Sequence, residues 1–98
     1  MKYVSTQRHL DWEIVESKIA NRDFDVQAVS LTIDGEEMLF ILDGHHSFAA
    51  AIEAKSQPEI TINNAIQQEA DSMSIDDFLE AHWMDSELYN IETGENIF

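Results

Sequence analysis

The chain has 98 residues, no cysteine, and 20 acidic against 5 basic side chains, which gives a formal net charge of -15 at pH 7. This length fits one domain with a single core, and the lack of cysteine excludes a disulfide, a thiolate metal site and a thiol nucleophile. No apolar run is long enough to span a membrane and no signal peptide is readable, so we expect a soluble protein of the cytoplasm.

The charge is distributed unevenly along the chain. All five basic residues lie in the first 55 positions, and every charged side chain after Lys55 is acidic. Proteins that bind nucleic acid directly neutralise phosphates with clustered Lys and Arg, so this pattern argues against direct binding to nucleic acid. The macromolecular partner that the charge favours is a basic protein, although acidity alone also keeps a small protein soluble and monomeric.

The first part of the chain predicts a strand, a helix and a hairpin. Residues 2–5 predict a short strand, and Asp11 is the expected N-cap of a helix. Apolar residues alternate over 29–33 and form a continuous run over 38–42, with the Asp-Gly pair at 34–35 as the favoured hairpin turn. We expect the second strand of this hairpin to be central in the sheet.

The remaining segments predict further helices and strands. An alanine-rich helix precedes a strand at 59–64, which we expect to return in the manner of a βαβ unit. After a polar stretch, a helix opens with Ser74 and Asp77 spaced as a capping box, and the Thr-Gly pair at 93–94 predicts a small hairpin. The fold class that these elements predict is α+β, with a mixed sheet and packed helices.

The junction between the central strand and the alanine-rich helix carries the residues Asp43 to Ser47. A strand that turns at once into a helix directs unpaired N–H groups and the positive end of the helix dipole at the junction, which can hold an anion. Gly44 permits a positive φ or a close backbone approach, Asp43 can cap the helix or hold a cation, and His45 and His46 can donate to phosphate. The alternative is that Asp43, Gly44 and the two histidines have only structural roles in this turn and bind no ligand.

The stretch ILDGHHSFAAA at 41–51 resembles the signature helix of the ParB/sulfiredoxin-like superfamily, especially its small ParB-like nuclease branch. In element order the resemblance covers about 3–63, which implies one ParB-like domain over 1–98 with an acidic helical and hairpin extension over 64–98. It also implies a nucleotide phosphate site at Gly44, His45 and His46.

Two positions depart from the family pattern. Ser47 stands where these families place an arginine that grips phosphate, and a hydroxyl replaces neither the charge nor the fork geometry of a guanidinium. His45 stands where sulfiredoxin has its catalytic cysteine, which excludes sulfiredoxin chemistry. We therefore expect weakened phosphate chemistry, no catalytic residue, and no cofactor unless Mg2+ accompanies a nucleotide at Asp43.

Metal and serine-hydrolase sites are not predicted. Adjacent residues on a helix point about 100 degrees apart, so Asp43, His45 and His46 cannot converge on a metal without His9, His82 or a distant acid. Ser47 lacks the spacing of a nucleophile elbow.

Two functions from different classes follow. The first is a non-enzymatic immunity or antitoxin-like inhibitor that covers a basic partner such as a nuclease toxin. Its candidate partner-binding residues are acidic or aromatic and lie late in the chain: Asp71, Asp76, Asp77, Glu80, Trp83, Asp85, Glu87 and Tyr89. The alternative is a nucleotide-binding ParB-like enzyme (an NTPase, phosphotransferase or nuclease) that uses the corner of Asp43, Gly44, His45, His46 and Ser47. An accessory domain of a larger assembly is a third option.

Overall fold

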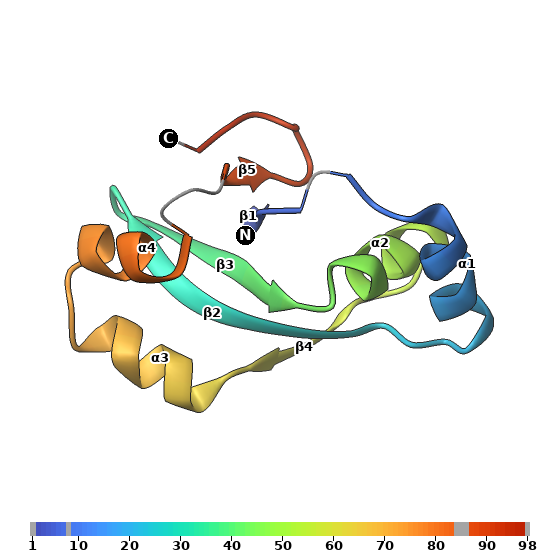
Figure 1. The fold of residues 1–98 in the computed structure, drawn as a ribbon, viewed down its shortest axis with the longest axis horizontal. Helices are drawn as coiled ribbons and strands as arrows, with labels where there is room; N and C mark the ends of the chain where they lie inside the picture. Colours follow the sequence, from blue (N-terminus) through green and yellow to red (C-terminus); the bar gives the residue numbers. More distant parts are fainter. Residues whose placement is uncertain (1, 8, 84–86, 98) are drawn as a thin grey trace.

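A five-stranded mixed sheet organises the chain, with its strands in the order β4-β2-β3-β1-β5 (Figure 1). The computed structural model describes residues 2–7, 9–83 and 87–97. The α+β class is confirmed, and the elements along the described chain are β1 (Lys2–Ser5), α1 (Trp12–Ala20), β2 (Asp25–Ile33), β3 (Glu36–Asp43), α2 (His45–Glu53), β4 (Glu59–Ile62), α3 (Asn64–Asp71), α4 (Ile75–Trp83) and β5 (Tyr89–Asn90).

Local sequence signals place the first four elements. The Asp11 carboxylate accepts a hydrogen bond from the Glu13 backbone N–H at 3.0 Å, which confirms the predicted N-cap of α1. Asp34 and Gly35 have φ values of +53° and +81°, as a tight hairpin turn between two twisted strands requires. β3 lies third of the five strands, so the prediction of a central strand is confirmed.

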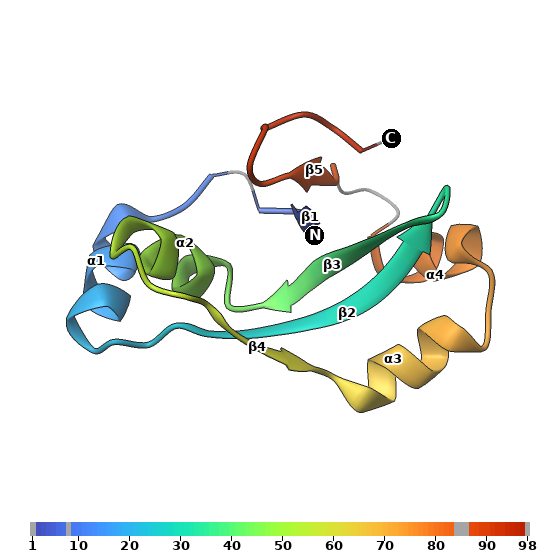
Figure 2. The same ribbon diagram turned by 180° about the vertical axis from the view of Figure 1, so that it is seen from behind.

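The strand after α2 does not form the βαβ unit that we expected. β4 pairs parallel with β2, which pairs antiparallel with β3, so β4 runs opposite to β3 and is not its neighbour. α2 has nine residues and is about 14 Å long, whereas the eight residues of β3 extend about 26 Å. The chain does not return along β3; after α2 it re-enters the sheet from the end that it left (Figure 2).

The polar stretch after β4 forms α3, which the sequence did not predict. Asn63 caps it by accepting from the Ile66 N–H at 3.1 Å. Pairing of β2 with β4 ends at Ala28 and Ile62, and beyond this point the Gln67 side chain bonds both the N–H and the C=O of Ser30, at 2.7 and 2.9 Å. Gln67 thus replaces a neighbouring strand at the edge of β2, so tertiary contacts hold α3 in place.

The main core lies between the sheet and α3 and α4, and it draws on both halves of the chain. Its buried members are Val4, Val29, Leu31, Met38, Phe40, Ala70, Phe78 and Leu88. Ser74 accepts from the Asp77 N–H at 3.2 Å, which confirms the predicted cap of α4. Residues after 63 therefore complete the same core as the strands, through Phe78 and Leu88.

A second apolar cluster joins α1 to α2 beyond one end of the sheet (Figure 1). It contains Val15 of α1, Phe24, and the small side chains of Ala50 and Ala51. Small residues allow the two helices to pack closely, so α1 fixes the position of α2 and of the corner at its start.

The predicted hairpin at the end of the chain is confirmed. Tyr89 of β5 bridges Asn96 antiparallel, Gly94 has a φ of +75°, and β5 adds to the sheet beside β1. Within the described ranges, no helix combines the length and the apolar character needed to cross a membrane.

Candidate functional site

The corner between β3 and α2 needs glycine for two structural reasons. Gly44 is the N-cap of α2 with a φ of +90°, a conformation that residues with a side chain rarely adopt. A Cβ atom here would overlap the carbonyl oxygen of Asp25 and lie 3.0 Å from the Cα of Val26. The left-handed turn and the close approach to β2 together account for Gly44.

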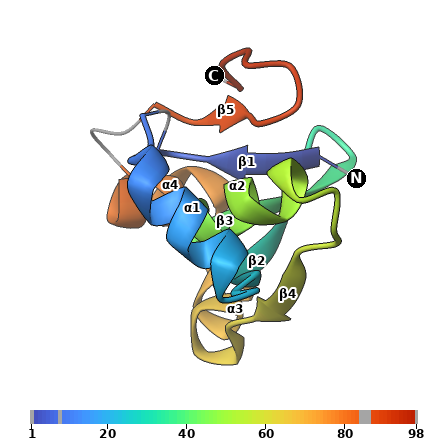
Figure 3. The same ribbon diagram turned by 90° about the vertical axis from the view of Figure 1, so that its right-hand side faces the viewer.

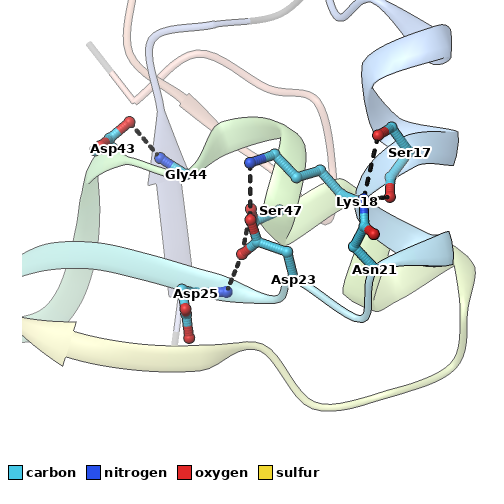
Figure 4. Close-up of polar contacts among 8 residues, drawn as sticks. All are labelled: Ser17, Lys18, Asn21, Asp23, Asp25, Asp43, Gly44 and Ser47. Carbon is cyan, nitrogen blue, oxygen red and sulfur yellow. Dashed lines mark hydrogen bonds and ion pairs between the residues drawn. The ribbon is translucent and has the colours of Figure 1, made fainter.

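Asp43 supports this turn rather than capping the helix. Its Oδ1 accepts a hydrogen bond from the Gly44 N–H at 2.8 Å, and its side chain is exposed (Figure 4). α2 has no side-chain cap at its N-terminus. The first N–H groups of α2 are therefore directed at the corner without a side-chain acceptor.

His45 connects α2 to the first strand. Its Nδ1 lies 2.7 Å from the Ser5 Oγ, which also accepts from the Gln7 N–H at 3.1 Å. Burial lowers the pKa of His45 below its ordinary value, the Asp43 carboxylate opposes this shift, and His46 adds to it. A neutral His45 that bonds Ser5 is a structural contact between α2 and β1.

His46 connects α2 to the start of α1. Its Nε2 accepts a hydrogen bond from the Asp11 backbone N–H at 3.2 Å, so this nitrogen carries no proton in the structure. The two adjacent histidines point to different partners, as expected for neighbours on a helix.

We expect the stability of the protein to fall as the pH drops below about 6.5, the ordinary pKa of histidine, in part because of His45. The unfolded chain takes up the His45 proton first, so stability present above this pH is lost as the pH falls towards the lower pKa of the folded state. Urea unfolding at about pH 7 and about pH 5 measures the effect. His45→Gln should show a smaller loss between the two conditions, and equal losses in both proteins would contradict the prediction.

Ser47 is buried and faces a carboxylate. It is 2% exposed, and its Oγ donates to Asp23 Oδ1 at 3.3 Å (Figure 4). Lys18 Nζ donates to the other oxygen of Asp23 at 2.8 Å, and this bond is the main cause that lowers the pKa of Asp23. The position at which the resembled families place a phosphate-gripping arginine is thus part of an internal polar network.

Carboxylates surround the corner. Asp25 and Asp43 line a hollow of about 350 Å3 beside it. The pKa of Glu59 is raised, first by a hydrogen bond with Asp25 and second by the negative charge of Asp25. The pKa of Lys18 is raised first by its bond to Asp23 and further by the charges of Asp43 and Asp25. Excess negative charge at the corner disfavours a phosphate and favours a cationic group.

The corner does not supply a ready metal site. Within residues 2–7, 9–83 and 87–97, no three His, Cys, Asp or Glu side chains form a group that could hold a metal ion. The separate directions of His45 and His46 agree with this finding.

α3 and α4 lie at the other end of the sheet from α2 (Figure 1). The predicted partner-binding acids are exposed on these two helices and just before β5. They are Asp71, Asp76, Asp77, Glu80 and Glu87. Asp85 lies outside the described residues. The carboxylates on α3 and α4 lie on the exposed sides of these two short helices, whose apolar sides pack into the core.

The two predicted aromatic anchors are half-buried. Trp83 stacks on Phe40 at 5.6 Å between ring centroids and meets Phe78 edge-on at 5.7 Å. The Tyr89 hydroxyl donates to the Gln7 carbonyl oxygen at 3.0 Å. Both residues therefore already have contacts within the protein and are only partly available to a partner.

Sequence reasoning missed an apolar pocket of about 180 Å3 between α1, α2 and β5. Trp12 and Ile52 line it although each is 57% exposed. The signal in the sequence was weak, since each is a single apolar residue beside a glutamate.

Searches for similar proteins found no matching family model, no matching curated protein and no matching solved structure. The resemblance to the ParB/sulfiredoxin-like superfamily therefore rests on the stretch 41–51 and on the order of elements that the sequence predicts.

Proposed function

We propose that this chain is a small acidic binding protein of the cytoplasm that acts as an immunity or antitoxin-like inhibitor of a basic partner, such as a nuclease toxin. The observation that carries the proposal is the set of exposed carboxylates on α3 and α4, here called the acidic face: Asp71, Asp76, Asp77 and Glu80. Among the described residues, ion pairs join Lys2 to Glu36 and Lys18 to Asp23, and His82 forms a hydrogen bond with Glu69. None of them neutralises the acidic face.

Electrostatics explains how such a face would act. The cleft of a nuclease must attract phosphates and is therefore basic, so a protein of net charge -15 is steered towards it. Opposed charges raise the association rate and select the partner, while apolar contacts at the interface supply much of the affinity.

Neutralising the acidic face should weaken binding of the partner. We expect Asp76→Asn, Asp77→Asn and Glu80→Gln together to lower affinity on the order of tenfold, because exposed ion pairs contribute up to about 1 kcal/mol each. The measurement is capture by the immobilised protein at low and at physiological salt, identification of retained proteins by mass spectrometry, and titration of the recovered partner.

The matched control makes the same change in net charge elsewhere, with Glu13→Gln, Glu16→Gln and Glu95→Gln. All three residues are exposed and lie outside the acidic face. The proposal fails if no basic protein is retained, if salt does not weaken the complex, or if the control loses as much affinity as the variant.

A second candidate is the nucleotide-binding ParB-like enzyme, and one observation favours it. The N-terminus of α2 has no side-chain cap, which leaves N–H groups available to a phosphate. Mg2+ held by Asp43 would then have to offset the surrounding carboxylates. His45 and His46, which already bond Ser5 and Asp11, would have to release those partners to reach a nucleotide.

A further inference from the structure

Two exposed apolar side chains meet at one pocket. Trp12 on α1 and Ile52 on α2 are each 57% exposed, more than the other exposed large hydrophobic residues of the described chain, Ile14 and Met73. Both line the pocket of about 180 Å3 between α1, α2 and β5. Figure 3 shows how these three elements lie, with α1 towards the viewer. Leaving such side chains in water is unfavourable, so their convergence on a hollow indicates a surface that a partner covers.

The pocket continues along α2 into a second hollow of about 340 Å3. The two share Phe48, Ile52 and Ile91, and together they form what we call the α2 groove. Glu53 lines the first hollow and Glu92 the second, whereas none of the described lysines or arginines lines either. The first hollow is mainly apolar, the second also has the polar side chains of Ser56 and Gln57, and each hollow has one glutamate in its lining.

We propose that the α2 groove binds an arginine side chain of a basic partner protein in the pocket between Trp12 and Ile52. The arginine stem is apolar and suits the walls, while the guanidinium stacks on aromatic rings and pairs with carboxylates such as Glu53. The pocket of about 180 Å3 holds one long side chain and is smaller than the pockets that enclose whole small-molecule ligands, at about 300 to 1,000 Å3.

His45 and Ser5 also line the pocket and bond each other at 2.7 Å. Burial lowers the pKa of His45 and so favours its neutral form, which would not repel a cation. The proposal rests on the proposed function only for the basic character of the partner, because the groove runs along α2, whereas α3 and α4, which carry the acidic face, lie at the other end of the sheet (Figure 1).

The test uses a defined peptide, acetyl-Lys-Gly-Arg-Gly-Lys-amide, and three versions with citrulline, lysine or norleucine in place of the arginine. Titrations are followed by the amide and indole N–H signals of the isotope-labelled protein. We expect saturable shifts at the indole of Trp12 and at the amides of Ala49 and Ile52. The citrulline, lysine and norleucine peptides should bind about fivefold to tenfold more weakly.

Variants of exposed residues supply matched controls. Trp12→Ala and Ile52→Ala should each weaken the arginine peptide about fivefold or more, whereas Ile14→Ala, also on α1 and 42% exposed but outside the groove, should not. Glu53→Gln should weaken it and Glu16→Gln should not. Circular dichroism confirms that each variant is folded.

Several results would overturn the proposal. Equal binding of the arginine and lysine peptides, both tighter than the two neutral replacements, would show attraction by net charge alone. Equal binding of all four would show that the central side chain is not recognised. Tighter binding of the norleucine peptide would assign the pocket to an apolar side chain. Shifts in the groove that depend on protein concentration without peptide would assign it to a second copy of the chain. If a basic partner is captured but the arginine peptide does not bind in the groove, only the proposal for the groove is refuted. If the arginine peptide binds but no basic partner is captured, only the proposed function is refuted.

Discussion

Gly44→Ala is expected to lower the free energy of unfolding by about 2 to 5 kcal/mol, which combines the cost of a left-handed residue with that of an atomic overlap. Gly44 has a φ of +90°, and an added Cβ would overlap the Asp25 carbonyl oxygen, which belongs to a paired strand and cannot move aside cheaply. The loss is large against the total stability of a small domain, about 5 to 15 kcal/mol. Urea unfolding measures this loss as a lower midpoint concentration of urea, with an unchanged slope of the free energy of unfolding against urea concentration.

Gly35→Ala is the matched control for this prediction. Gly35 has a similar φ of +81°, but a Cβ there would meet nothing within 4 Å. Its replacement should cost only the backbone part, about 1 to 2 kcal/mol. Equal losses in the two variants would show that the close contact between the corner and β2 does not constrain Gly44.

Phe78→Ala is expected to cost about 3 to 5 kcal/mol, because a large side chain is removed from a full core. Phe78 is fully buried and belongs to the same cluster as Val4 and Phe40, with the Trp83 ring edge-on at 5.7 Å. The variant tests whether residues after 63 are required for the stability of the sheet. The measurement is urea or thermal unfolding followed by circular dichroism.

Met73→Ala controls for side-chain loss at a surface position in the same part of the chain. Met73 is 37% exposed and lies between α3 and α4, so its replacement should cost less than about 1 kcal/mol. If Phe78→Ala cost no more than Met73→Ala, the segment after residue 63 would not share the core of the sheet.

Elements with strong local signals could be predicted from the sequence. Asp11 and Ser74 have cap chemistry, and the Asp-Gly turn fixes the hairpin that places β3 in the centre. α3 also has a local cap at Asn63, but the sequence pattern placed Asn63 in the preceding strand. The position of α3 depends further on Gln67 bonding Ser30, 37 residues away. The direction of β4 depends on its pairing with β2, which a pattern of strand, helix and strand does not reveal.

The candidate site was predictable in its residues but not in its contacts. The backbone conformation at position 44 requires glycine, as the sequence indicated. His45 and His46 find their partners 40 and 35 residues away, at Ser5 and Asp11, and nothing local in the sequence encodes these contacts. The α2 groove also depends on tertiary structure, since Trp12 and Ile52 come together only when α1 packs on α2.

Titration calorimetry with ATP and CTP in the presence of Mg2+ tests most directly whether the corner at Gly44 has only a structural role and binds no nucleotide. The carboxylates of Asp25 and Asp43 lie beside the corner, and its histidines already have protein partners. We therefore predict no saturable heat at millimolar nucleotide, in the natural protein and in His46→Ala alike. Saturable binding that His46→Ala abolishes would contradict this account and establish the corner as a working nucleotide site.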